Sequence, residues 1–203
     1  MTHETELVPN DYFRELRRED IFPHSSTERP FEVDLGCGDG GFLLKVSELL
    51  PDRDFLAVER VKGRVHKVRQ DLQREGRDNA RILRLDSIYV VGWLLPANSV
   101  SRLHLLCPDP WPKKKHHKNR ILRSQEFLGG LERILIPGGE FLLKTDQEDY
   151  FEEALEALKG QPWAEPLSWE QGEVEPYPET DFERQWLGMG RSIYRARWAR
   201  IAI

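Results

Sequence analysis

The sequence predicts an α/β protein with a mostly parallel sheet, helices on both faces and a carboxyl-terminal strand antiparallel to its neighbour. From residue 31 onward, short apolar runs alternate with segments of helical spacing, which is typical of a parallel sheet covered on both sides. Residues 192–203 interleave aromatic or β-branched side chains with arginines, as in a last antiparallel strand. The 203 residues, 39% hydrophobic and 32% charged, suit one sizeable core.

Each element is predicted from its own pattern, in chain order. Apolar runs predict strands at Phe31–Leu35, Phe55–Glu59, Arg81–Leu85, Val100–Leu106 and Phe141–Thr145, before the final strand. Helical spacing predicts helices at Phe42–Leu50, Lys62–Glu75, Ile121–Ile136 and Glu148–Leu158. A proline or glycine follows each helix closely and sets where it ends.

Two segments lack such periodicity. Residues 1–29 are polar and interrupted by Pro23, which predicts an N-terminal arm, with residues 30–203 forming the domain. After Gly160, a stretch rich in prolines and acids predicts irregular structure up to the last strand.

Composition and charge exclude several classes of protein. The formal net charge of −5 excludes a chain that is basic all over, so binding to nucleic acid requires a focused patch. Cys37 and Cys107 lie far apart without metal-ligand spacing, which favours a reducing, cytoplasmic setting and no metal. Neither a signal peptide nor an apolar run of the ~18 residues that span a membrane is recognisable, so we expect no membrane association.

The stretch from residue 103 to residue 120 combines a stiff turn with a basic strip. Asp109 follows an apolar strand and lies between two prolines, which presents its carboxylate at the strand end. Trp111 comes next and is either a packed turn residue or a stacking surface for a base. Six cations follow without an intervening acid: Lys113, Lys114, Lys115, Lys118, Arg120 and Arg123. This pattern predicts a reactive carboxylate beside a nucleic-acid patch.

A glycine-rich turn follows the first strand and opens the first helix. It reads Asp34-Leu35-Gly36-Cys37-Gly38-Asp39-Gly40-Gly41, and its glycines permit positive φ and close approach to a ligand. Acids also follow successive strands: Asp34, Glu59, Asp86 and Asp109. Because the carboxyl ends of parallel strands share one edge, we expect these acids to surround one crevice.

The acids favour S-adenosylmethionine over a dinucleotide. Its sulfonium is a cation without phosphates, whereas a pyrophosphate prefers a helix N-terminus free of acids. The alternatives are a tight turn without a ligand and acids that are merely solvated.

Together these motifs resemble the TrmB-type tRNA (guanine-N7)-methyltransferases. The resemblance covers Phe31 to about Leu187 and rests on Pro108-Asp109-Pro110-Trp111, the Lys-Lys-His-His-Lys-Asn-Arg strip, Lys144-Thr145-Asp146 and Thr180-Asp181-Phe182-Glu183. It implies the Rossmann-like class I methyltransferase fold with a seven-stranded sheet. The implied activity is methylation of guanosine at position 46 in the tRNA variable loop, with no obligatory protein partner.

The resemblance also implies residue roles. The implied cofactor contacts are Asp34, Gly36, Gly38, Glu59, Asp86 and Asp109, and Asp109 is the implied catalytic residue. The implied guanosine contacts are Lys113, Asp146, Thr180, Asp181, Phe182 and Glu183. The implied RNA contacts are Lys115, His116, His117, Lys118, Asn119 and Arg120. The chain departs from the family at Asp34, usually glutamate, at Asp181, commonly lysine, and at Pro112, frequently histidine.

Guanine N7 carries a lone pair and no proton, so its methylation needs no general base. Positive charge develops on the ring, which Asp109 or Asp146 would stabilise. Glu183 would accept from guanine N1 and the exocyclic amine, which selects the base.

Three other functions remain open from the residues. An amino-group methyltransferase for adenine or cytosine shares a related turn at this strand end, although the second proline is missing here. A non-catalytic RNA-binding module would keep the fold without the reaction. An NAD-dependent dehydrogenase would use the same type of glycine turn.

Overall fold

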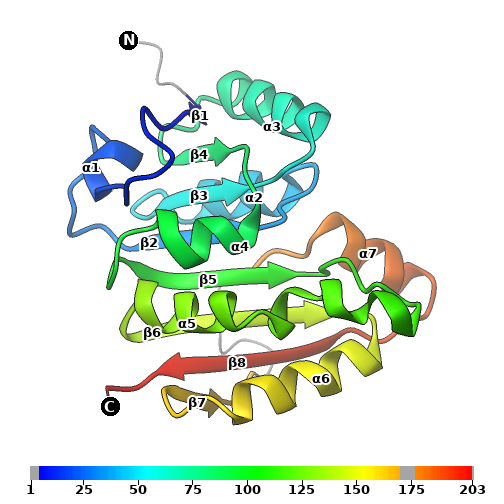
Figure 1. Cartoon of the computed structure of the whole chain (residues 1–203). Helices are drawn as coiled ribbons and strands as arrows, with labels where there is room; N and C mark the ends of the chain where they lie inside the picture. The colour runs from blue at the N-terminus through cyan, green and yellow to red at the C-terminus, as the bar shows by residue number, and fades with distance from the viewer. Residues whose placement is uncertain (1–4, 170–176, 203) are drawn as a thin grey trace.

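A computed structural model describes residues 5–169 and 177–202. Its centre is one eight-stranded sheet in the order β1-β4-β3-β2-β5-β6-β8-β7 (Figure 1). The strands are β1 (Glu6–Leu7), β2 (Phe31–Leu35), β3 (Asp54–Val58), β4 (Ala80–Leu83), β5 (Val100–Leu106), β6 (Leu135–Thr145), β7 (Ala164–Leu167) and β8 (Tyr194–Arg200). Strand β8 is antiparallel to both of its neighbours, β6 and β7, and the other pairs of described strands are parallel. The predicted α/β class, mostly parallel sheet and antiparallel carboxyl-terminal strand are confirmed.

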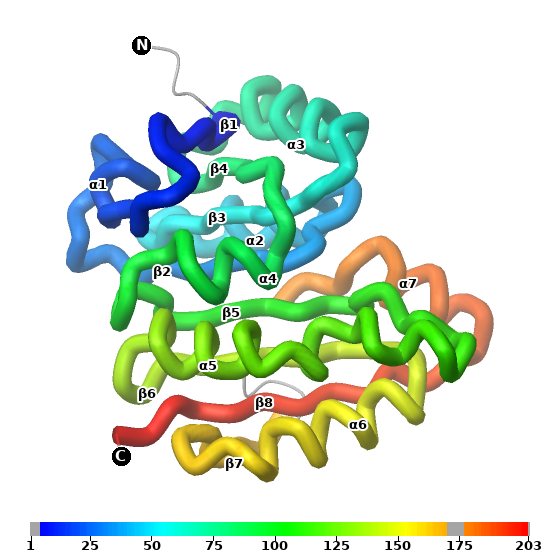
Figure 2. The backbone as a smooth tube through the Cα atoms, in the orientation of Figure 1, coloured from blue at the N-terminus to red at the C-terminus, as the bar shows by residue number. Residues whose placement is uncertain are grey.

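Helices cover both faces of this sheet (Figure 2). The α-helices are α1 (Arg18–Ile21), α2 (Gly41–Leu49), α3 (Lys62–Arg74), α4 (Ser87–Tyr89), α5 (Gln125–Ile134), α6 (Glu148–Lys159) and α7 (Asp181–Gly188). A π-helical turn, η1 (Val90–Leu94), and two 3-10 turns, η2 (Lys114–Asn119) and η3 (Ile121–Arg123), complete the set. None of the helices described is both long enough and apolar enough to pass through a membrane.

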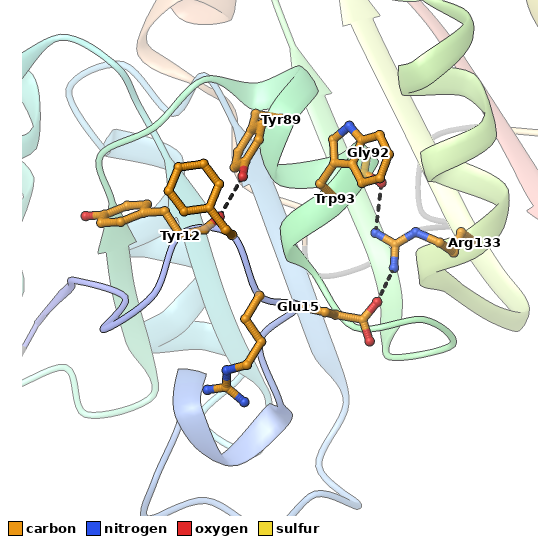
Figure 3. A pocket seen from close by; sticks show the side chains of 8 residues that line it. Tyr12, Glu15, Tyr89, Gly92, Trp93 and Arg133 are labelled. Carbon is orange, nitrogen blue, oxygen red and sulfur yellow. Dashed lines mark hydrogen bonds and ion pairs between the residues drawn. The ribbon is translucent and has the colours of Figure 1, made fainter.

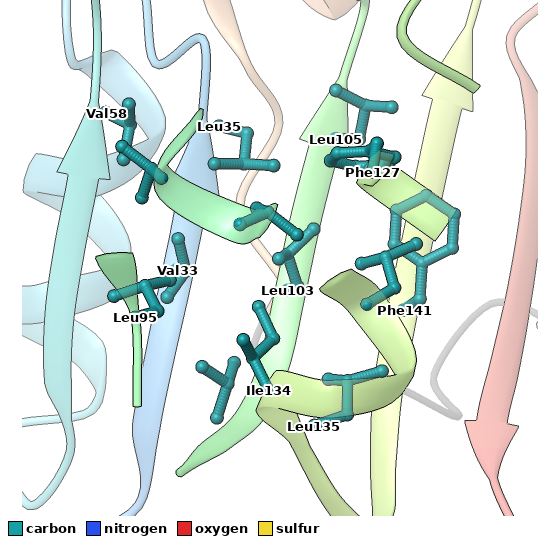
Figure 4. Packing of buried hydrophobic residues seen from close by; sticks show 14 of the residues in the cluster. Val33, Leu35, Val58, Leu95, Leu103, Leu105, Phe127, Ile134, Leu135 and Phe141 are labelled. Carbon is teal, nitrogen blue, oxygen red and sulfur yellow. The ribbon is translucent and has the colours of Figure 1, made fainter. Parts of the chain in front are cut away.

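Buried side chains form one apolar layer on each face of the sheet. Leu56 and Val58 of β3 point into the larger layer, which Phe127 and the rest of α5 close from outside (Figure 4). Phe55 and Ala57 point the other way, into a layer closed by α2 and α3. This alternation along one strand is the period of two that a doubly covered sheet requires.

The helix expected at Ile121–Ile136 begins later. Residues 121–123 form the turn η3, and Ser124 then caps α5 by accepting the N–H of Phe127 at 3.2 Å. Strand β6 starts directly after α5, at Leu135, and runs through Pro137. The proline therefore lies inside an extended strand rather than between helix and strand.

The segment after Gly160 is more regular than its composition predicts. Strand β7 pairs with β8, with Pro166 opposite Trp198, and Trp163 beside it is 1% exposed. Helix α7 begins after Thr180, whose Oγ1 accepts the N–H of Glu183 at 2.9 Å. The proline-rich pattern predicts irregular structure, but burial of Trp163 stabilises β7 and the Thr180 cap stabilises α7. Residues 170–176 of this segment lie outside the described residues.

The N-terminal segment packs onto the domain. Strand β1 adds an eighth strand beside β4, and the Arg81 guanidinium donates to the carbonyls of Glu6 at 3.2 Å and Ile21 at 2.6 Å. Leu16 and Ile21 are buried in the larger apolar layer. The division between residues 1–29 and residues 30–203 stays a prediction.

We predict that Ile21→Ala lowers the free energy of unfolding by about 2–5 kcal/mol, because it leaves a cavity under a fully buried side chain. Val8→Ala, at a position 63% exposed, is the matched control and changes stability little. Urea unfolding measures both. Equal stabilities for the two variants would mean that the segment contributes nothing to the fold.

Candidate active site

The glycine turn between β2 and α2 adopts the backbone that its sequence predicts. Gly36, Gly38 and Gly40 have φ values of 68°, 57° and 81°, in the left-handed region that favours glycine. A Cβ on Gly40 would lie 2.8 Å from Val68, so helix α3 packs directly against this turn. The positive φ values therefore require glycine at these three positions of the turn, which lies at the carboxyl edge of the sheet.

Glu59 ties the glycine turn to the next strand. Its carboxylate accepts the N–H of Gly38 at 3.2 Å and that of Val61 at 2.8 Å. The Arg64 guanidinium lies 3.8 Å from one of its oxygens. Glu59 thus holds the glycine turn at the end of β3.

Asp34 lies beside Glu59, whose negative charge it faces. It is 4% exposed, and no hydrogen bond or ion pair reaches its carboxylate from the described residues. Burial, and secondarily the charge of Glu59, raise the pKa of Asp34 to about 7. A buried carboxylate in this state lacks a cation or a hydrogen-bond donor.

Asp86 and Asp109 lie at the ends of the flanking strands. Strands β4, β3, β2 and β5 are adjacent and parallel, so all four predicted acids occupy one edge of the sheet. Asp86 caps α4 by accepting the N–H groups of Ile88 at 2.9 Å and Tyr89 at 3.2 Å. Asp109 is exposed.

The backbone around Asp109 is strained on both sides. Cys107 and Trp111 have φ values of 50° and 47°, which are uncommon for residues with a Cβ. The Cys107 N–H donates to the carbonyl of Lys144 at 2.8 Å, which anchors the start of this turn on β6. Trp111 is half-buried, with its ring centroid 6.0 Å from that of His116.

A second group of predicted residues gathers where β6 meets α7. The Lys144 ammonium lies 2.8 Å from both oxygens of Glu183, and both residues are buried. Asp146 pairs with Arg191 at 3.0 Å. Burial, followed by the charges of Asp146 and Glu183, raises the pKa of the Cys107 thiol to about 11. Cys107 thus lies close to both acids.

The first turn of α7 lies over the glycine turn. The Phe182 ring comes within 3.9 Å of the position that a Cβ on Gly38 would take. The Asp181 carboxylate occupies the space that a Cβ on Gly41 would need. These contacts place the predicted substrate residues against the predicted cofactor loop.

The basic strip forms the 3-10 turn η2, and its cations differ in environment. Lys113, Lys115 and Lys118 are exposed, as is Asn119, whereas His116 and His117 are half-buried. Arg120 is 3% exposed. Its guanidinium donates to Pro110 O at 2.9 Å and pairs with Asp149 at 2.6 Å and Glu153 at 3.0 Å.

The environment of Arg120 thus joins the turn around Asp109 to helix α6. A contact of Arg120 with RNA stays a prediction. In the fold, Arg120 stabilises the turn around Asp109 by linking it to helix α6.

Some residues at this edge lie outside the sequence-based prediction of the site. Tyr177 donates to or accepts from His104 Nδ1 at 2.8 Å, and His104 Nε2 lies 2.8 Å from Glu32. Lys144 is a second such residue, and the sequence signal for it is a lysine inside an otherwise apolar strand. Trp169 lies edge-on to Tyr177, with ring centroids 5.1 Å apart.

A separate pocket of about 490 Å³ lies at the N-terminal segment and holds none of the predicted site residues (Figure 3). Tyr89 OH donates to the Tyr12 carbonyl at 2.6 Å, and Arg133 links Glu15 to the carbonyl of Gly92. These contacts hold residues 12–15 against η1.

The donor set at the sheet edge fits S-adenosylmethionine. The buried Asp34 carboxylate and the neighbouring Glu59 offer negative charge to a sulfonium or its amino group and acceptors to ribose hydroxyls. Among residues 5–169 and 177–202, no group of three or more His, Cys, Asp or Glu side chains has the arrangement of a metal site.

Comparison with solved structures identifies the fold. The 16S rRNA methyltransferase KamB superposes with a TM-score of 0.63 at 20% identity, over 93% of this chain and 96% of that one. A SAM-dependent O-methyltransferase from Thermotoga maritima gives a TM-score of 0.60 at 16% identity, over 94% of this chain and 68% of that one. The fold is therefore that of the class I methyltransferases.

Sequence comparison identifies the family. Residues 28–196 match the family model Methyltransf_4, described as "Putative methyltransferase". The tRNA (guanine-N(7)-)-methyltransferase of Halorhodospira halophila is 36% identical over 168 residues, which cover 81% of this chain and 72% of that protein. The Nitrosococcus oceani enzyme of the same name is 33% identical over 168 residues, covering 83% and 70%. This chain belongs to the tRNA (guanine-N7)-methyltransferase family.

Proposed function

We propose that this protein transfers a methyl group from S-adenosylmethionine to N7 of guanosine 46 in the variable loop of tRNA, forming 7-methylguanosine. The observation that carries the proposal is the buried Asp34 carboxylate beside Glu59 at the glycine turn, which no cation or hydrogen-bond donor of residues 5–169 and 177–202 reaches. Family membership supports both the reaction and the class of substrate. The two free cysteines are compatible with action in the reducing cytoplasm.

Several acids at the sheet edge would bind S-adenosylmethionine together. Asp34, Glu59 and Asp86 lie at neighbouring strand ends and would hold its charged and hydroxyl groups. S-adenosylmethionine supplies the methyl group on a positively charged sulfur. Asp109 projects from the turn beyond β5, where its exposed carboxylate is available to the acceptor base.

The chain's contribution to the reaction is positioning and electrostatics. Guanine N7 attacks with its lone pair, so no residue has to remove a proton. The ring gains positive charge as the bond to the methyl group forms, and the Asp109 carboxylate would stabilise that charge. Asp146 and Glu183 would hold the base from the β6 and α7 side. Glu183 would accept from guanine N1–H and the exocyclic amine.

Exposed lysines beside the crevice would bind the RNA backbone. Lys115 and Lys118 lie on η2, and Arg120 fixes the base of this turn to helix α6. A chain of net charge −5 gains little from long-range attraction to RNA, so local phosphate contacts at this strip would supply the affinity. We propose that tRNA binds here without an obligatory protein partner.

We predict that Asp109→Ala lowers kcat by a factor of about 10²–10³, because charge stabilisation in the transition state is lost. The affinity for tRNA changes little. The assay incubates the protein with S-adenosylmethionine and an unmodified tRNA transcript and then cleaves the RNA chemically at 7-methylguanosine. Asp78→Ala, at an exposed loop position before β4, is the control. Equal losses of rate and tRNA affinity would contradict the catalytic role.

We predict that Asp34→Asn stabilises the free protein but weakens its binding of S-adenosylmethionine. A folded pKa of about 7 lies above the unfolded value of about 3.9, so the stability present at acid pH is lost as pH rises towards 7. The gain in stability from the variant is therefore larger at about pH 8 than at about pH 5.

Urea unfolding at the two pH values measures the difference in stability. Calorimetry measures the affinity for S-adenosylmethionine. In the wild type, affinity for the cation rises with pH as Asp34 ionises, and the variant lacks that dependence. A variant that binds the cofactor like wild type at every pH would remove Asp34 from the site.

We predict that the double change Lys115→Ala and Lys118→Ala weakens tRNA binding and flattens its dependence on salt. Each lost phosphate contact reduces the slope of log affinity against log salt by about 0.7–0.9. Binding is measured across a salt series, with Lys159→Ala on the far end of α6 as a control that removes one exposed positive charge away from η2. An unchanged slope would show that η2 does not contact phosphate.

A further inference from the structure

Helix α7 ends in a glycine cap that fixes the position of the residue after it, Arg191. Gly190 has a φ of 74°, and its N–H donates to the carbonyl of Leu187 at 2.9 Å. The Arg191 N–H donates to the carbonyl of Trp186 at 3.0 Å. These are the two hydrogen bonds of a Schellman motif, in which the residue after the glycine packs back on the last turn of the helix. Arg191 packs with its guanidinium, whose central carbon lies 4.2 Å from the centroid of the Trp186 ring.

The sheet topology brings Arg191 to Asp146. Strand β8 is antiparallel to β6, with Thr145 opposite Tyr194, so the end of β6 and the start of β8 meet at the carboxyl edge of the parallel strands (Figure 1). Arg191 Nη1 lies 3.0 Å from Asp146 Oδ2. The side chains of Arg191 and Asp146 are 49% and 10% exposed. The guanidinium therefore covers a carboxylate of the proposed guanosine site and is itself half exposed.

Both partners of this ion pair keep unused hydrogen-bonding capacity. Asp146 Oδ2 also accepts from Gln147 Nε2 at 2.5 Å, so both donors use the same oxygen. Among residues 5–169 and 177–202, no hydrogen bond reaches Asp146 Oδ1, and none leaves Nε or Nη2 of Arg191. A guanidinium has five N–H donors in one plane. Arg191 can therefore bind a further anion without giving up Asp146, whose second oxygen remains for the base.

The negative charge of this edge makes a cation necessary wherever a phosphate approaches. The candidate site contains the carboxylates of Asp34, Glu59, Asp86, Asp109, Asp146 and Glu183. Lys144 lies among them, but it is 4% exposed and its Nζ is 2.8 Å from Glu183. The proposed reaction brings a nucleotide to this edge, and the acids repel its phosphates unless a cation lies between them. The lysines of η2 follow β5, whereas Arg191 lies beside the end of β6.

We propose that Arg191 binds a phosphate next to the target guanosine and so bridges Asp146 and the RNA backbone. The planar guanidinium matches two oxygens of one phosphate, which a lysine does not. The Trp186 ring and the Schellman motif hold the side chain before RNA arrives, so less side-chain freedom is lost on binding. This inference rests on the proposed function and adds an RNA contact outside the basic strip of η2.

The first test measures tRNA binding across a salt series for wild type, Arg191→Gln, Arg191→Lys and the control Arg74→Gln. Arg74 is also an exposed arginine paired with an aspartate, Asp71 at 2.6 Å, on the last turn of α3. In Arg191→Gln the slope of log affinity against log salt should fall by about 0.7–0.9, so binding weakens about 5- to 8-fold at about 0.1 M salt and converges with wild type near 1 M. Arg191→Lys keeps the charge and should keep the slope, as should the control.

The second test locates the phosphate. The tRNA is ligated from two pieces so that the phosphate on the 5′ or the 3′ side of the target guanosine is replaced by a neutral methylphosphonate. At one of these positions the replacement should weaken binding to wild type about 5- to 8-fold at about 0.1 M salt and leave binding to Arg191→Gln unchanged. The control Arg74→Gln should respond to both replacements as wild type does.

A side chain that only holds α7 against β6 gives a different result. Arg191→Gln would then weaken tRNA binding by the same factor at every salt concentration and with every methylphosphonate, and this outcome would overturn the inference. An unchanged salt slope in Arg191→Gln, in a protein whose wild type methylates the transcript, overturns the inference alone. If wild type binds the transcript but methylates no guanosine, the proposed function fails, and the two binding tests still decide whether Arg191 contacts phosphate.

Discussion

The site depends on one electrostatic constraint, which is the burial of the Asp34 carboxyl group with no cation or hydrogen-bond donor to it among the described residues. Parallel strands bring Asp34 and Glu59 to the same sheet edge, and the glycine turn closes over them. Glu59 accepts two N–H groups of the loop, whereas Asp34 has no partner among the described residues. The fold tolerates this because the two apolar layers supply the stability. A cationic donor of methyl groups is the natural complement of such an edge.

Cations around the crevice serve in two ways, according to burial. Arg120 is buried and saturated by a carbonyl and two carboxylates, so it shapes the turn that presents Asp109. Among residues 5–169 and 177–202, no ion pair engages the exposed lysines of η2, so their charges are available to an anionic polymer. A single basic run in the sequence therefore combines a structural clamp with a binding surface, in a chain whose overall charge is negative.

Much of this architecture is readable from the sequence, for identifiable reasons. Strands β2 and β5 have the predicted bounds because each is an apolar run buried on both faces. Strand β1 was not predictable, since two residues carry no periodicity and its hold on the domain comes from Arg81. Helix α7 was missed although Thr180-x-x-Glu183 is a capping signal, because the surrounding prolines outweighed it.

In the candidate site, too, some features are readable from the sequence and others are not. The strand-end acids follow from topology, since sheet direction alone places them on one edge. Pairings across the sheet do not follow from it. A lysine inside an apolar run indicates a buried partner, but nothing in the sequence identifies that partner as Glu183. The clamp at Arg120 likewise depends on Asp149 and Glu153, one helical turn apart on α6, whose approach is set by tertiary packing.

The two outer strands of the sheet bear on how the protein behaves at high concentration. An open sheet exposes unpaired backbone groups at its rims, where foreign chains can attach and aggregate. Here one rim strand, β1, is only two residues long, and the other, β7, contains Pro166, which has no N–H to offer. Both rims are poor templates for a neighbouring chain, so the molecule keeps its broad sheet from polymerising.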